Sequence, residues 1–187
     1  MLAPIEPAID PVPALEVLVG AGKYREATAL CAEEHGPSVG RICMAMLGNQ
    51  AEAQEVAQET FLAAYQGMAN FRAEGSVRAW LFGIARRQCA RRLQRGPKRH
   101  LELVADKHAG TESSDRGLRD RRRREELQEQ LSTLKPSERE VLLLRFAGDL
   151  SFKEVAKLLD LSEATARKRA SRALARLREQ FQQDEID

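Results

Sequence analysis

Basic side chains crowd the stretch from residue 163 to residue 178. The densest part of this stretch comprises Arg167, Lys168, Arg169 and Arg172. No acidic residue occurs between Ala164 and Arg178, whereas a solvated charged helix, the alternative interpretation, normally intersperses glutamate among its cations. An acid-free run of cations suits the phosphates and guanine edges of DNA. The segment is therefore predicted to bind DNA.

A second predicted helix precedes this cationic segment. Ser151 and Glu154 have the spacing of a capping box, and the helix that they begin has an apolar face formed by Val155, Ala156, Leu158 and Leu159. Asp160 and Leu161 interrupt this helix, and Ser162 can cap the cationic one. Two helices joined by a short turn predict a helix-turn-helix motif whose second helix reads DNA.

The stretch from residue 51 to residue 95 changes from acidic to basic along its length. Its first part carries Glu52, Gln54, Glu55, Gln58 and Glu59. Its last part carries Arg86, Arg87, Arg91, Arg92 and Arg95. The acidic face suits a protein partner and the basic face suits a phosphate backbone. Phe71, Trp80 and Phe82 lie between them and could stack on an unpaired base, although the apolar neighbours of Phe71 and Trp80 favour core packing.

The sequence offers little for catalysis or for binding a metal or cofactor. Cys31 and His35 stand four residues apart, but two ligands are too few for a metal site, and the three cysteines form no CxxC motif. No carboxylate cluster and no nucleophile paired with a base is evident. We therefore expect a protein without metal or cofactor that is not an enzyme.

Composition and periodicity predict an all-α protein with two small helical domains. The expected order is a proline-rich tail at 1–13, a helical domain at 14–95, a flexible linker at 96–124, the helix-turn-helix domain at 125–181 and a tail at 182–187. A helix break is expected at Gly36-Pro37. No apolar run is long enough to cross a membrane, and the odd cysteine count fits a reducing cytoplasm.

Three segments together resemble the extracytoplasmic-function group of bacterial RNA polymerase sigma factors. The core-polymerase-binding helix of that group is similar to AEAQEVAQETFLAAY, and its promoter-melting segment is similar to FRAEGSVRAWLFGIARR. Its minus-thirty-five-binding domain is similar to the stretch from Leu131 to Glu179. The resemblance implies a sigma factor that binds core RNA polymerase and promoter DNA, recognises two promoter elements and melts the promoter. It also implies a cognate anti-sigma factor as a partner.

The same resemblance implies a role for individual residues. The polymerase contacts would come from Glu55, Gln58, Glu59 and Leu62. The loop that captures a flipped minus-ten base would consist of Arg72, Ala73, Glu74, Gly75 and Ser76. The residues near the opened strands would be Arg86, Arg87 and Arg91. The residues in or beside the major groove at minus thirty-five would be Ser162, Thr165, Arg167, Lys168, Arg169 and Arg172.

Two other classes of protein are compatible with parts of this pattern. A regulator that binds an operator without polymerase would use the helix-turn-helix alone, with the first domain sensing a ligand or forming a dimer. A nucleic-acid-processing enzyme would need the catalytic groups that the chain lacks. Val77 and Arg87 also differ from the residues common in the sigma factor group, Phe and Asn, so no minus-ten sequence is carried over from other members.

Overall fold

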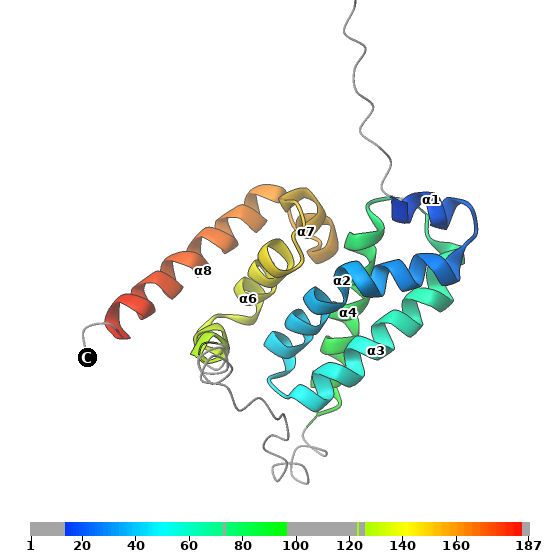
Figure 1. Ribbon diagram of the computed structural model, residues 1–187. Helices are drawn as coiled ribbons and strands as arrows, with labels where there is room; N and C mark the ends of the chain where they lie inside the picture. Colours follow the sequence, from blue (N-terminus) through cyan, green and yellow to red (C-terminus); the bar gives the residue numbers. More distant parts are fainter. Residues whose placement is uncertain (1–13, 73, 97–122, 124–125, 185–187) are drawn as a thin grey trace, which may run out of the picture.

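A computed structural model describes residues 14–72, 74–96, 123 and 126–184. These residues form helices joined by short turns and contain no β-strand, which confirms the prediction of an all-α fold. The predicted tail at 1–13 lies outside the described residues, as do Ala73, most of the predicted linker, and positions 185–187. The helices form two groups, one before and one after the predicted linker (Figure 1).

The first group of helices forms a bundle. It consists of α1 (Ala14–Gly20), α2 (Tyr24–Leu47), α3 (Gln50–Gly67), the short 3-10 helix η1 (Met68–Asn70) and α4 (Val77–Gln94). Gly48 ends α2 in the left-handed conformation that glycine adopts easily, with φ of 71°. Asn49 then accepts a hydrogen bond from the Glu52 amide and begins α3. The core includes the fully buried side chains of Val39, Val56, Leu81 and Phe82.

The predicted break at Gly36-Pro37 is wrong. Helix α2 continues through Pro37, although proline removes one backbone hydrogen bond from a helix interior. Residues on both sides of Pro37 are buried in the same core, among them Cys31, Val39 and Ile42. The burial of this apolar face stabilises the continuous helix and outweighs the lost hydrogen bond.

The second group contains the helix-turn-helix. It consists of a helical segment at 126–133, α6 (Pro136–Leu142), the π-helical turn η2 (Leu143–Ala147), α7 (Phe152–Leu159) and α8 (Glu163–Asp184). Ser151 and Glu154 form both hydrogen bonds of the predicted capping box at the start of α7. Asp160 ends α7 with φ of 53°, a conformation that aspartate tolerates better than most residues. Helix α8 extends past position 181, where the domain was expected to end.

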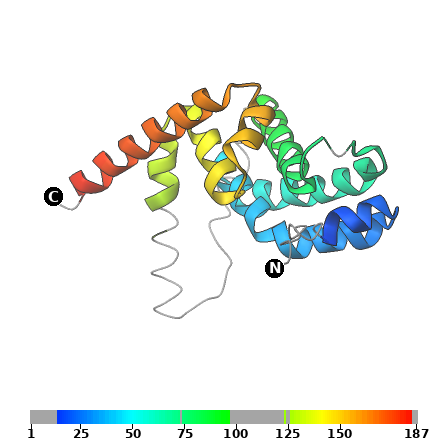
Figure 2. The ribbon, with the colours of Figure 1, turned by 90° about the horizontal axis from the view of Figure 1, so that it is seen from above.

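The two groups pack against each other. Helix α7 lies beside α4, and α8 projects away from the first group (Figures 1 and 2). A methyl group of Leu158 lies 2.9 Å from the position that a Cβ atom on Gly83 would take, so the absence of a side chain at Gly83 permits this contact. Ile42 of α2 similarly approaches Gly148. The described helices thus share one contiguous hydrophobic core, whereas the sequence suggested two separate domains.

Candidate nucleic-acid interface

The start of α8 is fixed by two hydroxyl groups for which the family resemblance implies DNA contacts. Ser162 accepts a hydrogen bond of 3.1 Å from the backbone amide of Thr165, and the two hydroxyl groups lie 2.8 Å apart. Ser162 therefore caps α8 as the sequence predicts. Both residues stand at the exposed N-terminal end of the helix, where a hydroxyl group can also reach a phosphate.

The basic side chains of α8 differ in whether they form ion pairs with the described residues. The guanidinium group of Arg167 pairs with Glu163 and lies 4.7 Å from the centre of the Phe152 ring. Lys168 and Arg172 are exposed, Arg169 is half-buried, and none of the three forms an ion pair with the described residues. Lys168, Arg169 and Arg172 are therefore available for a ligand, whereas Arg167 must first leave its partner in the same helix.

The loop between η1 and α4 is anchored inside the first group of helices. At one end the rings of Phe71 and Trp80 lie 5.4 Å apart in a tilted arrangement. At the other end Ser76 accepts a hydrogen bond from the Ala79 amide and caps α4. The predicted base-capturing residues Arg72, Glu74, Gly75 and Ser76 thus connect two fixed points, while Ala73 lies outside the described residues.

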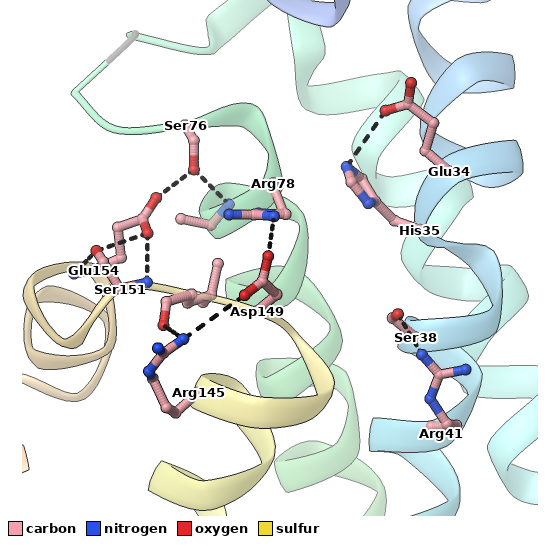
Figure 3. Close-up of polar contacts among 12 residues, drawn as sticks. Glu34, His35, Ser38, Arg41, Ser76, Arg78, Arg145, Asp149, Ser151 and Glu154 are labelled. Atoms are coloured by element: carbon pink, nitrogen blue, oxygen red, sulfur yellow. Dashed lines mark hydrogen bonds and ion pairs between the residues drawn. The ribbon is translucent and has the colours of Figure 1, made fainter. Parts of the chain in front are cut away.

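The same loop also contacts the helix-turn-helix. Ser76 donates a hydrogen bond to Glu154, the glutamate of the capping box of α7 (Figure 3). Lys157, one turn further along α7, donates a hydrogen bond of 2.6 Å to the backbone carbonyl of Glu74. Burial raises the pKa of Glu154, but hydrogen bonds from Ser76 and Ser151 outweigh burial and leave this pKa below its ordinary value. Glu154 is therefore ionised at neutral pH.

Two ion pairs extend this contact along α4. Arg78 lies 3.1 Å from a carboxylate oxygen of Asp149, which also faces Arg145 (Figure 3). Arg86, predicted to lie near opened DNA strands, pairs with Glu140 of α6. Glu140 of the second group therefore occupies Arg86, a basic group predicted to lie near DNA, whereas Arg78, the partner of Asp149, had no predicted role. Sequence reasoning missed Asp149 and Glu140, because nothing in their local sequence indicates contact with distant arginines.

Arg87 and Arg91 lie at a pocket on the first group of helices. The pocket has a volume of about 320 Å³ and opens between α3 and α4. Its lining consists of Ala63, Gly67, Asn70, Trp80, Ile84, Arg87, Gln88 and Arg91. Burial and the neighbouring Arg86 and Arg91 lower the pKa of Arg87. The pocket combines an aromatic ring with hydrogen-bond donors, the groups that hold an extruded base.

Of the three aromatic residues considered for base stacking, only Trp80 borders this pocket. Phe82 is fully buried, and its ring centre lies 6.2 Å from that of His35, so it belongs to the core. Phe71 and Trp80 are partly buried and pack against the core. The core packing expected for Phe71 and Trp80 is therefore confirmed, and one part of Trp80 also remains accessible.

The acidic face of α3 is organised by an arginine from α4. Arg92 donates hydrogen bonds of 2.7 Å to Glu55 and 3.0 Å to Glu59. The Arg92 side chain is only 16% exposed, whereas those of Glu55 and Glu59 are 61% and 49% exposed. Leu62 is 58% exposed on the same helix, and Gln58 is exposed as well. The structure thus leaves the four predicted polymerase-binding residues at the surface.

Cys31 and His35 lie on the inner side of α2. Burial, together with nearby Glu34 and Glu16, raises the pKa of the Cys31 thiol to about 11, so the thiolate required of a metal ligand or nucleophile is disfavoured at neutral pH. Burial also lowers the pKa of His35. The described residues contain no group of three potential metal ligands. None of the described helices is long and apolar enough to span a bilayer.

Comparison with known proteins identifies both groups of helices. Residues 31–99 match the family model for Sigma-70 region 2, and residues 124–177 match that for Sigma-70, region 4. The probable RNA polymerase sigma-C factor of Mycobacterium bovis is 30% identical over 70% of this chain and 70% of its own length. The ECF RNA polymerase sigma factor EcfG of Rhodopseudomonas palustris is 29% identical over 75% of this chain and 77% of its own length.

A solved structure shares the overall fold. The structure of CnrH in complex with the cytosolic domain of CnrY has a TM-score of 0.70, covering 91% of this chain and 96% of that chain at 22% identity. Across eight of its curated relatives, the chain spans between 38% and 92% of their own lengths. The two family models occur in the order that the resemblance requires, on the two groups of helices that carry the predicted surfaces. The chain belongs to the extracytoplasmic-function type of RNA polymerase sigma factors.

Proposed function

We propose that this protein directs core RNA polymerase to promoters and melts the DNA there, while the polymerase supplies the chemistry. The observation that carries this proposal is the presence of two basic surfaces together with an acidic face. Helix α8 presents Lys168, Arg169 and Arg172 to the minus-thirty-five element. The loop at 72–76 and the pocket beside Arg87 and Arg91 bind the unpaired minus-ten strand. Helix α3 presents Glu55, Glu59 and Leu62 to polymerase.

This function requires the two groups of helices to separate. The two promoter elements lie about 25 base pairs apart, which is about 85 Å of duplex. A compact chain of 187 residues has a radius of gyration of only about 16 Å, so the packed arrangement is too small to engage both elements. Roughly 30 residues lie between the two predicted domains, and such a length of chain extends to at most about 100 Å. We infer that the packed arrangement is a closed state of the sigma factor.

The contacts between the two groups favour such a rearrangement. Besides apolar contacts such as that of Leu158 with Gly83, they include hydrogen bonds and ion pairs at partly exposed positions, among them Arg78 with Asp149 and Lys157 with Glu74. Pairs of this kind contribute about 0–1 kcal/mol each. Binding of the acidic face of α3 and of both DNA surfaces to large partners offsets their loss. Two weak DNA contacts held on one polymerase gain affinity through their high effective concentration.

An anti-sigma factor is the regulator expected for this chain. The similar CnrH structure contains the cytosolic domain of CnrY, and another solved structure is described as the sigma factor RpoE with the anti-sigma factor NepR from Bartonella quintana. We propose that a protein of this kind binds the present chain and holds the closed state. Purification of the chain from its native cells, with and without stress, would recover such a partner.

Association with polymerase distinguishes this proposal from operator binding. The purified chain is expected to form a stable complex with core polymerase and to initiate at promoters that can be mapped by sequencing transcript ends after overproduction. An operator-binding regulator would instead bind duplex DNA tightly without polymerase. Failure to bind core polymerase, combined with specific binding to duplex DNA by the chain alone, would refute the sigma factor function.

Arg172 is expected to be a main contact of α8 with the minus-thirty-five element, because it is exposed and has no partner among the described residues. Arg172→Ala should weaken binding of the holoenzyme to this element by about 1–3 kcal/mol. A base contact would relax the preference at one position, whereas a phosphate contact would weaken all sequences alike and lower the salt dependence. Electrophoretic mobility shifts at several salt concentrations measure both effects.

Arg178 provides a matched control for this substitution. It is an exposed arginine on the same helix, more than a full turn beyond Arg172. Arg178→Ala removes the same charge at a greater distance from the N-terminal end of α8, so it should have a smaller effect than Arg172→Ala. Equal losses in both variants would show that only the overall charge of α8 matters.

A further inference from the structure

The N-terminus of α4 receives a carboxylate from outside the segment matched by the family model. Glu16 of α1 accepts a hydrogen bond of 3.1 Å from the backbone amide of Val77, the first residue of α4. Val77 directly follows Ser76, the last residue of the predicted base-capturing loop. Helix α1 precedes residues 31–99, so the match to region 2 assigns it no role.

Helix α1 holds Glu16 firmly in this position. Leu15, the preceding residue, is only 4% exposed and belongs to the core. The turn after α1 is closed by a backbone hydrogen bond from Lys23 to Leu18, with Gly22 at φ of 73°. The Glu16 carboxylate is therefore positioned by a packed helix, α1, that is joined to α2 through a defined turn.

The burial of the Glu16 carboxylate is energetically unfavourable, so its position calls for an explanation. Its second oxygen is buried and has no hydrogen-bond partner among the described residues. A buried carboxylate oxygen without a partner is unfavourable, and an unsatisfied group of this kind calls for an explanation. The first-turn amides of an 18-residue helix and their partial positive charge offset part of this cost. Among the described residues, the Val77 amide at the start of α4 is thus the hydrogen-bond partner of the Glu16 carboxylate.

The contacts of the loop with the second group of helices cannot persist on a promoter. In the closed state Ser76 is held by Glu154, and the carbonyl of Glu74 is held by Lys157. Both partners belong to α7, which must leave to reach the minus-thirty-five element. After that departure, the fixed points of the loop are the Phe71–Trp80 contact at one end and the capped start of α4 at the other.

We propose that Glu16 is a positioning residue for promoter melting, which holds the α4 end of the loop at 72–76 in place through the Val77 amide once α7 has moved away. This inference rests on the proposed sigma factor function. A base extruded from the duplex binds best to a loop whose conformation is already fixed. If the loop had to become ordered on binding, the lost entropy would reduce the binding free energy that offsets unstacking of the base. Glu16 touches no DNA in this scheme and acts through the backbone of α4.

Three substitutions at Glu16 test this role in holoenzyme made with the full chain. Glu16→Ala removes the acceptor, Glu16→Asp keeps the charge but withdraws the oxygen by one methylene, and Glu16→Gln keeps an acceptor oxygen without the charge. Permanganate reactivity of unpaired thymines on a duplex promoter should fall about threefold to tenfold for Ala and Asp, the range expected for one lost hydrogen bond. The Gln variant should open the promoter as the unsubstituted protein does.

Two further measurements separate positioning from general stability. Asn49→Ala removes a comparable cap, the hydrogen bond from the Glu52 amide at the start of α3, and should lower the thermal midpoint without reducing promoter opening at saturating polymerase. On a template with mismatched minus-ten bases, the defect of Glu16→Ala should largely disappear, because the unstacking step is already complete.

Several outcomes would overturn this role. Undiminished opening with both Ala and Asp, equal losses in Glu16→Ala and Asn49→Ala, or a loss with Gln as large as with Ala would each exclude positioning through this hydrogen bond. Should Glu16→Ala fail to fold, the comparison of Asp with Gln decides the question alone. Failure of the unsubstituted holoenzyme to open any promoter would instead refute the sigma factor function and remove the basis for the role of Glu16.

Discussion

Reversing the charges of Glu55 and Glu59 to lysine should weaken the binding of this sigma factor to core polymerase by at least about a hundredfold, because like charges brought together at an interface cost several kcal/mol. Both carboxylates are about half-exposed or more on α3, beside the exposed Leu62. Titration of labelled protein with core polymerase, followed by fluorescence anisotropy, measures the effect directly.

The result must be compared with a change at Arg92, because this partly buried arginine pairs with both glutamates and would lose these partners in the reversed variant. Arg92→Gln is the matched control, since it breaks the same pairs and leaves the acidic face intact. Leu62→Ala, at an exposed residue, should weaken polymerase binding with little change in thermal stability. If Arg92→Gln abolished binding as completely as the charge reversal, the acidic side chains would be important for the geometry of the bundle rather than for direct contact.

Placing a leucine at Gly83 should drive the two groups of helices apart. Leu158 of α7 already lies 2.9 Å from the position of a Cβ atom at Gly83, so a larger side chain cannot be accommodated without moving α7. The radius of gyration measured by small-angle X-ray scattering should rise above the value of about 16 Å expected for a compact chain of this length. High salt should act in the same direction on the unsubstituted protein, since it screens the partly exposed ion pairs.

Gly40→Leu is the matched control for this experiment. Gly40 is also a helical glycine, but apart from its chain neighbours and the backbone of its own helix, no atom of the described residues lies within 4 Å of the position that a Cβ atom would take. The control should keep the scattering profile of the unsubstituted protein. A compact profile for both variants would mean that the contact of α7 with α4 does not hold the closed state.

Local patterns predicted the helix-turn-helix accurately. The capping box of Ser151 and Glu154, the turn at Asp160 and the cap at Ser162 are interactions between residues that are close in sequence. Such interactions depend on side-chain chemistry at fixed spacing, which can be read directly from the chain. The predicted break at Pro37 failed for the complementary reason, because burial of α2 on both sides of the proline depends on helices distant in sequence.

The charged surfaces of α8 and α3 and the pocket beside Trp80 could be predicted from the sequence only in part. The basic character of α8 and the acidic character of α3 follow from composition along one helix, so their exposed residues were identified from the sequence. The pairing of Arg92 with Glu55 and Glu59 depends on how α4 packs against α3. The pocket beside Trp80 and Arg87 likewise exists only between two packed helices.

The sequence by itself determined the all-α class and the helix-turn-helix, because periodicity, caps and charge act over a few neighbouring positions, and it predicts which residues meet polymerase and DNA. The tertiary structure alone decided that Glu154 contacts Ser76, that Glu140 pairs with Arg86 and that Glu16 reaches Val77. Each of these contacts joins residues more than fifty positions apart. Contacts over such separations are specified by the packing of whole helices, and no local pattern records them.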